Sequence, residues 1–226
     1  MHVSVRYMMQ PPLVPSLDKA CQLPPKIGDV APDFMARTTQ GMLTFSSLRG
    51  SWILLFSHPA DFTPVCTSEF IALAKNSEGF ARLNCVLVGV SIDSLPSHLA
   101  WLEAIHSCFG VNVPFPVVED PSMAIAQAYG MLDAEAESSA TVRGVYIIDP
   151  AGIIRAITWY PATVGRSVKE LLRVIQALQT VDASGNMTPE GWEPGKDVVA
   201  NNPVTQEEVM AAGPAWFLQY KKVRKS

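Results

Sequence analysis

Two continuous apolar runs, residues 52–57 and residues 85–92, constrain the fold of this chain more than any other feature. Each has the length of a β-strand, and the second is rich in β-branched residues. Apolar character that is continuous rather than alternating is typical of strands covered on both faces. A helical pattern follows each run, and strand and helix patterns alternate up to about residue 182. This alternation predicts an α/β protein with a central mixed sheet and helices on both of its faces.

Turn signals and apolar spacing predict the other elements. Glycine-containing turns indicate two hairpins, one joining residues 34–38 to 42–45 and one joining residues 142–149 to 153–158. Apolar residues at helical spacing, together with one short apolar run, predict further elements along the chain. These are helices 64–82 and 94–106, a strand at 115–118, a helix opened by Pro121 and running to about residue 129, and a helix at 167–180.

The composition changes near residue 182, where Pro, Gly and polar residues become frequent. The segment that follows is too short to hold much of a core by itself. We therefore expect a loosely ordered N-terminal extension at residues 1–23, a main domain at 24–182 and a small C-terminal extension at 183–226.

Charge and cysteine usage exclude several classes of protein. The net charge is −4, and the one basic cluster, at residues 221–225, is interpreted as a solvated tail, so we expect no nucleic-acid partner. No apolar run approaches the ~20 residues of a membrane span. The cysteines are irregularly spaced and lack a CxxC pair, which argues against a disulfide framework or a zinc site. We expect no metal, no cofactor and a reducing, cytoplasmic location. The four cysteines are Cys21, Cys66, Cys85 and Cys108.

The junction between the first apolar run and the next helix contains the candidate nucleophile. Thr63 is a favourable N-cap residue, and Pro64 suits the first helical position, where a missing N–H costs nothing. Cys66 then occupies the third helical position, where unpaired N–H groups and the positive end of the helix dipole favour an anion. We therefore expect Cys66 to be partly thiolate near neutral pH. The alternative, a small buried hydrophobic residue, suits Cys85 better because Cys85 begins an apolar strand.

The residues around Cys66 resemble a known family. Pro59-x-x-x-Thr63-x-x-Cys66 resembles the active-site signature of the peroxiredoxins, and the longer string FSHPADFTPVCT, from Phe56 to Thr67, resembles their one-cysteine (AhpC/TSA-like) subfamily. The string WEPGKDV at residues 192–198 resembles the C-terminal extension of that subfamily. The resemblance implies a thioredoxin-like fold, a homodimer to which the extension contributes, and a thiol-dependent peroxidase that reduces hydrogen peroxide and organic hydroperoxides. Assembly beyond a dimer is left open.

The resemblance also implies roles for four residues. Cys66 would attack the peroxide O–O bond and become a sulfenic acid, and Pro59 would shield the pocket from water. The Thr63 hydroxyl would bond to the peroxide and to the sulfur, in addition to capping the helix. Arg143, in the string RGVYIIDP, matches the active-site arginine of the family. Its guanidinium would stabilise the thiolate and the negative charge that develops as the O–O bond breaks.

Three further residues are expected to support the site, each with an ordinary structural alternative. The subfamily has a histidine near the sulfur at the position of His58, although a hydrogen-bonded structural histidine is the competing interpretation. Arg166 matches a second arginine of the subfamily. Glu69 would hold one arginine in place, although a glutamate in the first turn of a helix needs no such explanation.

The cysteine positions predict the reaction cycle. No cysteine follows Cys108 in the sequence, so we expect a one-cysteine cycle with an external thiol reductant such as glutathione. Cys108 itself, at the end of a predicted helix, is expected to be structural. Residues 49–53 lack the framing glycines of the Gly-x-Ser-x-Gly string that some relatives carry, so Ser51 is expected to be a turn residue without lipase activity.

Three other functions compete with the peroxidase. A thiol–disulfide oxidoreductase on the same fold would need a second cysteine close to Cys66. A non-catalytic interaction or chaperone protein would use Cys66 only as a sensor. A cysteine hydrolase would need His58 as a base together with an orienting carboxylate, and the sequence indicates no such partner.

Overall fold

The computed structural model describes residues 23–132 and 140–222. Most of the predicted N-terminal extension, including Cys21, lies outside these residues. The chain forms two compact units, Met1–Arg166 and Ser167–Ser226. The boundary therefore falls after Arg166, whereas the predicted domain boundary falls after residue 182, and the predicted domain limits stay a prediction.

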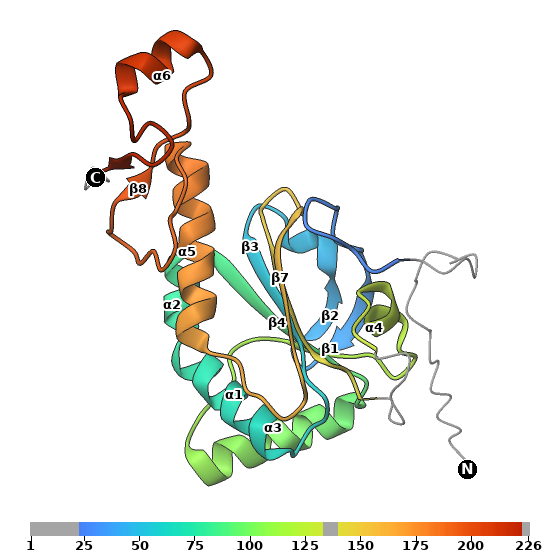
Figure 1. Cartoon of the computed structure of the whole chain (residues 1–226). Helices are drawn as coiled ribbons and strands as arrows, with labels where there is room; N and C mark the ends of the chain where they lie inside the picture. The colour runs from blue at the N-terminus through green and yellow to red at the C-terminus, as the bar shows by residue number, and fades with distance from the viewer. Residues whose placement is uncertain (1–22, 133–139, 223–226) are drawn as a thin grey trace, which may run out of the picture. The chain divides into compact units, whose positions relative to one another are not determined.

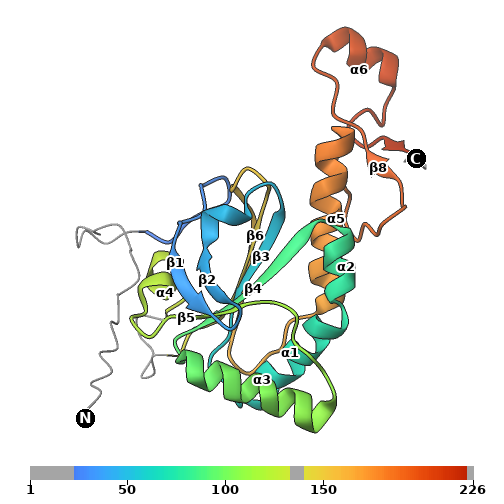
Figure 2. The same cartoon turned by 180° about the vertical axis from the view of Figure 1, so that it is seen from behind.

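A seven-stranded mixed sheet is the framework of the first unit, with the strand order β2-β1-β5-β4-β3-β6-β7 (Figures 1 and 2). The strands are β1 (Met35–Thr38), β2 (Gly41–Thr44), β3 (Trp52–Ser57), β4 (Cys85–Ser91), β5 (Val117–Glu119), β6 (Arg143–Ile148) and β7 (Ile154–Tyr160). Strand β3 pairs in parallel with β4 and antiparallel with β6, which places it in the interior of the sheet. Both predicted hairpins are confirmed, because β1 pairs with β2 and β6 pairs with β7.

The helices of the first unit differ from the predictions mainly at their ends. They are the 3₁₀-helix η1 (Phe45–Leu48), α1 (Pro64–Lys75), α2 (Ser77–Arg82), α3 (Leu95–Phe109) and α4 (Ala124–Ala128). The single helix predicted over residues 64–82 is broken at Asn76, whose side-chain amide donates to the Ala72 carbonyl oxygen and competes with the backbone. Helix α4 begins later than its predicted start at Pro121, since the Asp120 carboxylate accepts from the Ala126 N–H and caps a later turn.

Alternate residues of β3 face two layers of the core. Ile53 and Leu55 belong to a buried cluster that includes residues of α4. Phe56 packs on the other side against Phe70 of α1 and against Phe115, with ring centroids 5.6 and 5.7 Å apart. Figures 1 and 2 show α1 and α3 side by side and α4 beside β1. Helices cover both faces of β3, which explains why its sequence is continuously apolar.

The second unit begins with the predicted amphipathic helix, α5 (Val168–Ser184). The Ser167 side chain accepts from the Glu170 N–H at its start, and Gly185, with φ of 65°, ends it. Trp192 is buried and its indole N–H donates to the Lys196 carbonyl oxygen. The remaining elements are β8 (Val198–Val199), α6 (Gln206–Ala212) and β9 (Tyr220–Lys221). In the described part of the chain, no helix combines the length and the apolar character needed to cross a membrane.

Candidate active site

The candidate site lies in the first unit, at the end of β3. The loop of residues 58–63 leads from this strand to the N-terminus of α1 (Figure 1). Strand β6 is antiparallel to β3, so its first residue, Arg143, lies beside the last residues of β3. The topology therefore brings together side chains that are far apart in the sequence.

Cys66 is the third residue of α1, as predicted, and its side chain is buried. Pro64 is the first residue of the helix and Thr63 is its N-cap residue. The Arg143 Nη1 donates to the Cys66 sulfur at 3.3 Å. The sulfur thus lies close to two sources of positive charge, the helix N-terminus and a guanidinium.

The Thr63 hydroxyl does not cap α1, so that part of its predicted role is wrong. Its Oγ1 donates to the Ala60 carbonyl oxygen at 2.9 Å and closes the loop that precedes the helix, and no side-chain cap bond is present. A hydroxyl that donates in this way keeps its lone pairs as acceptors. The predicted bonds from Thr63 to the peroxide and the sulfur stay a prediction. Pro59 is buried in the same loop.

The Glu69 carboxylate links two buried arginines. Arg143 donates from Nη1 to Oε2 at 2.7 Å. Arg166 donates from Nε to Oε1 and from Nη2 to Oε2, each at 2.8 Å, and its backbone N–H donates to Oε1 at 2.7 Å. Burial alone would raise the pKa of Glu69, but the hydrogen bonds and charge of Arg166, followed by the charge of Arg143, hold it below its usual value. Glu69 therefore holds both arginines, where one was expected.

The remaining donors of the two arginines fix the backbone around the site. Arg143 donates from Nε and Nη2 to the Ala162 carbonyl oxygen at 2.9 and 2.7 Å. Arg166 donates from Nη1 to the carbonyl oxygens of Ser57 and Gly144 at 2.9 and 3.0 Å, which ties the end of β3 to the start of β6. The guanidinium groups are thus held rigidly in place.

His58 belongs to a second buried group, with Asp61 and His98. The His58 Nε2 lies 2.9 Å from Asp61 Oδ1, and the His98 Nδ1 lies 2.8 Å from Asp61 Oδ2. The Ser97 hydroxyl also donates to Asp61 Oδ2, at 2.8 Å. These distances show that His58 has a structural partner, the alternative named from the sequence. Asp61 and His98 are not among the predicted site residues. The sequence near His98 could not indicate its contact with Asp61, because the two residues are 37 positions apart in the chain and meet only when α3 packs beside the loop.

The protonation of this second group follows from its surroundings. Burial lowers the pKa of His58, and the hydrogen bond to Asp61 opposes this only in part. Burial alone would raise the pKa of Asp61, but the hydrogen bonds from His58 and His98 outweigh it and hold the pKa well below its usual range. At neutral pH, Asp61 is therefore a carboxylate and His58 is a neutral imidazole.

The other residues singled out by the sequence lie in ordinary structural positions. Cys85 begins β4, and burial raises the pKa of its thiol to about 12, in agreement with the inert role expected for it. Cys108 is exposed near the end of α3, and the structural role expected for it stays a prediction. The Ser51 hydroxyl donates to Asn84 Oδ1 at 3.1 Å in the turn before β3. The three described cysteines are all free.

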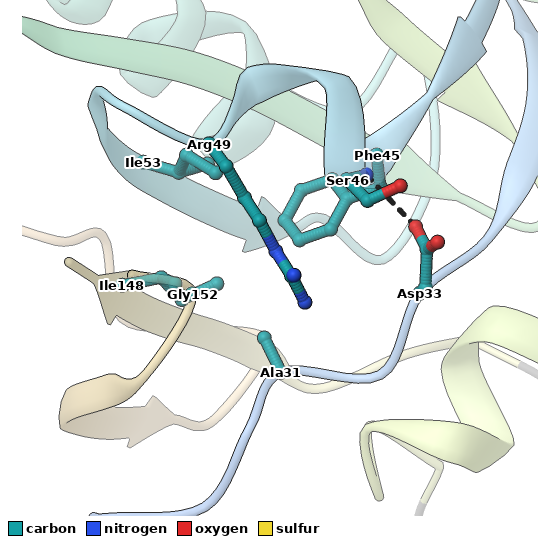
Figure 3. Close-up of a pocket in the computed structure, with 8 residues that line it drawn as sticks. All are labelled: Ala31, Asp33, Phe45, Ser46, Arg49, Ile53, Ile148 and Gly152. Atoms are coloured by element: carbon teal, nitrogen blue, oxygen red, sulfur yellow. Dashed lines mark hydrogen bonds between the residues drawn. The ribbon is translucent and has the colours of Figure 1, made fainter. Parts of the chain in front are cut away.

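A small hollow lies at the opposite end of β3 and β6 from Cys66. Figure 3 shows the Arg49 side chain extending across it toward Ala31. The Arg49 Nε lies only 3.1 Å from where a Cβ on Gly152 would be, so the arginine itself fills much of the space. This hollow is therefore separate from the candidate site. Its lining residues are Ala31, Asp33, Phe45, Ser46, Arg49, Ile53, Ile148 and Gly152.

The fold and the site together define a class of protein, the thiol-dependent peroxidases built on a thioredoxin-like fold. The AhpC/TSA family model matches residues 27–157, and a model of the C-terminal domain of 1-Cys peroxiredoxin matches residues 177–212. The chain belongs to the peroxiredoxins. It is therefore an oxidoreductase that uses a thiol to reduce peroxides, as the resemblance implied.

Relatives of known name agree with this assignment. The chain is 44% identical over 223 residues to peroxiredoxin 2 of Caldanaerobacter subterraneus subsp. tengcongensis, covering 95% of this chain and 100% of that protein. It is 47% identical over 171 residues to a peroxiredoxin of Aquifex aeolicus, covering 75% of this chain and 77% of that protein.

Solved structures show the same fold. A yeast mitochondrial 1-Cys peroxiredoxin has a TM-score of 0.80 and 40% identity, covering 88% of this chain and 100% of that chain. Peroxiredoxin 6 of Arenicola marina also has a TM-score of 0.80, with 34% identity and coverage of 89% and 100%. These similarities confirm the predicted thioredoxin-like fold with a C-terminal extension.

Proposed function

We propose that Cys66 is the peroxide-reducing nucleophile of a one-cysteine cycle. The observation that supports this most strongly is the buried contact of the Arg143 guanidinium with the Cys66 sulfur at 3.3 Å. Arg143, Arg166 and Glu69 are all buried and carry two positive charges and one negative charge. A Cys66 thiolate brings the charge of this buried group to zero, which is the least costly state in a low-dielectric interior.

The proposed step transfers one oxygen atom. The thiolate of Cys66 attacks the terminal peroxide oxygen as the O–O bond breaks, and water or an alcohol leaves with the proton of the peroxide. The sulfur is oxidised to a sulfenate, which takes up a proton from solvent to become the sulfenic acid, while the peroxide is reduced. Further oxidation to sulfinic acid is the side reaction. The described contacts occupy four of the five N–H donors of Arg143. The remaining donor, on Nη2, is available to the negative charge that develops on oxygen.

The other residues prepare this step. Thr63, through the lone pairs of its hydroxyl, accepts from the peroxide, and buried Pro59 keeps water away from the sulfur. Glu69 and Arg166 hold Arg143 in position through their shared hydrogen bonds. Positioning of this kind lowers the barrier because the reacting groups are already held in the geometry that the reaction needs.

An external thiol completes the proposed cycle. It attacks the sulfenic acid to form a mixed disulfide and water, and a second thiol then releases Cys66. The match to the 1-Cys peroxiredoxin C-terminal domain supports this, as does the description of the yeast mitochondrial relative, whose thiol is resolved through glutathione/thioredoxin systems. Glutathione is thus the first reductant to test. We further propose a homodimer, as the resemblance implied, and a cytoplasmic location, as the cysteine usage indicated.

The experiment is stopped-flow reaction of the reduced full chain with hydrogen peroxide, followed by intact mass. We expect rapid loss of one thiol per chain and a mass increase of one oxygen. Cys66→Ser abolishes peroxide consumption, whereas Cys108→Ser, a matched change at an exposed cysteine, leaves it unchanged. Peroxide consumption that survives in Cys66→Ser would show that another group does the chemistry.

A further inference from the structure

The Ser57 hydroxyl lies at the point where the pairing of β3 with β6 ends. The last paired residues of the two strands are Phe56 and Val145, and Ser57 comes next in β3. Its side chain is buried, and it is not among the site residues predicted from the sequence. Buried hydroxyl groups in native proteins are almost always hydrogen-bonded. The two partners of this one lie on either side of Arg143.

A single oxygen atom bridges the two peptide groups that flank Arg143. The Ser57 Oγ donates to the Val142 carbonyl oxygen at 2.6 Å and accepts from the Gly144 N–H at 2.9 Å. These atoms belong to the peptide groups directly before and directly after the Arg143 Cα. A hydroxyl can make both bonds because it has one donor and two acceptor sites. Since each peptide group is planar, Ser57 fixes both backbone torsion angles of Arg143.

The sequence around this contact allows the close approach. A Cβ on Gly144 would lie only 3.2 Å from the Ser57 Oγ, so a residue with a larger side chain would crowd the hydroxyl. A second buried hydroxyl acts beside it, because the Thr141 Oγ1 donates to the His58 carbonyl oxygen at 2.9 Å. Side-chain hydrogen bonds therefore continue the connection between the two chain segments after the strand pairing stops.

This connection relates the arginine to the nucleophile. The segment that begins at Ser57 leads through the loop of residues 58–63 to Cys66 in α1. The contacts with Glu69 and Ala162 fix the guanidinium end of Arg143, and the Ser57 hydroxyl fixes the backbone from which the side chain extends. Functional groups at such sites must be held to about 0.5 Å by the contacts of the residues behind them.

We propose that Ser57 is a positioning residue of the peroxidase reaction. Its hydroxyl holds the Arg143 backbone so that the guanidinium meets both the Cys66 sulfur and the negative charge that develops on the peroxide oxygen. This role rests on the proposed function, in which Cys66 is the nucleophile. Ser57 acts only through Arg143, and it exchanges no proton with the peroxide.

The first test compares two reactions of Cys66 in Ser57→Ala. One is stopped-flow oxidation by hydrogen peroxide, and the other is alkylation by iodoacetamide, followed at Cys66 by peptide mass. Alanine cannot bridge the two peptide groups, so we expect the rate constant with peroxide to fall about tenfold. The rate of alkylation should stay unchanged, because that reaction breaks no O–O bond and does not need the guanidinium to be aligned.

Thr38→Val is the matched control. The Thr38 Oγ1 is also in a buried residue and also bridges two backbone groups, donating to the Gly41 carbonyl oxygen at 2.9 Å and accepting from the Gln40 N–H at 3.0 Å. It lies on β1, which is separated from β6 by three strands. This variant loses a similar pair of hydrogen bonds and should keep both rates. An equal loss of peroxide rate in the two variants would contradict a specific role for Ser57.

The second test is a double-mutant cycle with Arg143→Lys, measured by the rate of reaction with peroxide. If Ser57 acts through the guanidinium of Arg143, Ser57→Ala should have little further effect once that guanidinium is gone. Multiplication of the two separate effects in the double variant would overturn the proposal. So would a wild-type peroxide rate in Ser57→Ala.

Two measurements decide the matter if Ser57→Ala does not fold. Ser57→Thr keeps the hydroxyl and should keep the peroxide rate, and a tenfold fall would count against the proposal. In the wild type, the Gly144 amide proton should exchange slowly with solvent, whereas exchange as fast as that of an exposed amide would show that Ser57 does not hold it. Failure of Cys66→Ser to abolish activity would instead overturn the assignment of the nucleophile, whatever Ser57 does.

Discussion

Replacing Glu69 with Gln removes the charge that links two buried arginines while keeping the size of the side chain. The carboxylate accepts four hydrogen bonds from Arg143 and Arg166, and all three side chains are buried. Breaking a buried ion pair by removing one partner costs about 3–5 kcal/mol. For a chain of this size, each kcal/mol lowers the melting temperature by about 2–4 °C, so we expect a decrease of about 6–20 °C.

Two effects on the reaction oppose each other in Glu69→Gln. The additional net positive charge favours the Cys66 thiolate, but this gain is limited because the fraction of thiolate cannot exceed one. Loss of the Glu69 contact with Arg143 Nη1 misaligns the guanidinium in every encounter with peroxide. Misalignment of about 1 Å can cost about a hundredfold in rate, so we expect the second-order rate constant to fall by about tenfold to a hundredfold.

The assays are thermal unfolding at fixed protein concentration and stopped-flow oxidation by hydrogen peroxide. Glu170→Gln is the control, because Glu170 also makes a two-point contact with an arginine, Arg173, but their side chains are 48% and 29% exposed. An exposed pair contributes about 0–1 kcal/mol, so this variant should behave nearly like the wild type. If Glu69→Gln matched Glu170→Gln in both assays, the view that Glu69 organises the site would be refuted.

Two further predictions concern the ionisation of buried groups in the first unit. Because burial raises the pKa of Cys85 to about 12, iodoacetamide at pH 8 should label exposed Cys108 but not Cys85 in the folded chain, as read by peptide mass; labelling of Cys85 would contradict its burial. The native pKa values of Asp61 and Glu69 lie below their ordinary values of 3.8 and 4.5, and that of His58 lies below 6.5. At these three groups the unfolded chain therefore binds more protons than the native chain as the pH falls. The free energy of unfolding, measured in urea, should decrease just below pH 6.5 as His58 titrates in the unfolded chain, and decrease further below pH 4.5 as the two carboxylates do. A free energy of unfolding that stays constant over this range would contradict the prediction.

The local sequence was sufficient to place the nucleophile. A buried strand followed by an N-cap residue, a proline and a helical pattern puts Cys66 at the third helical position, and each signal depends only on neighbours in the chain. The two hairpins were predictable for the same reason, since a short turn fixes which strands pair. Predictions failed where a side chain had more than one possible hydrogen-bond partner nearby. The Thr63 hydroxyl, for example, donates to the Ala60 carbonyl oxygen instead of capping the helix.

Only the tertiary structure decided which distant groups surround the sulfur. Arg143 is 77 residues from Cys66 in the chain, and it reaches the sulfur because β6 runs antiparallel beside β3. The pairing of Glu69 with two arginines and the meeting of Asp61 with His98 depend on the same packing of elements. Residue spacing specifies which face of a helix or strand a side chain occupies, but not which other element packs there. Contacts between elements depend on strand order and on how the core is filled, and these are properties of the whole chain.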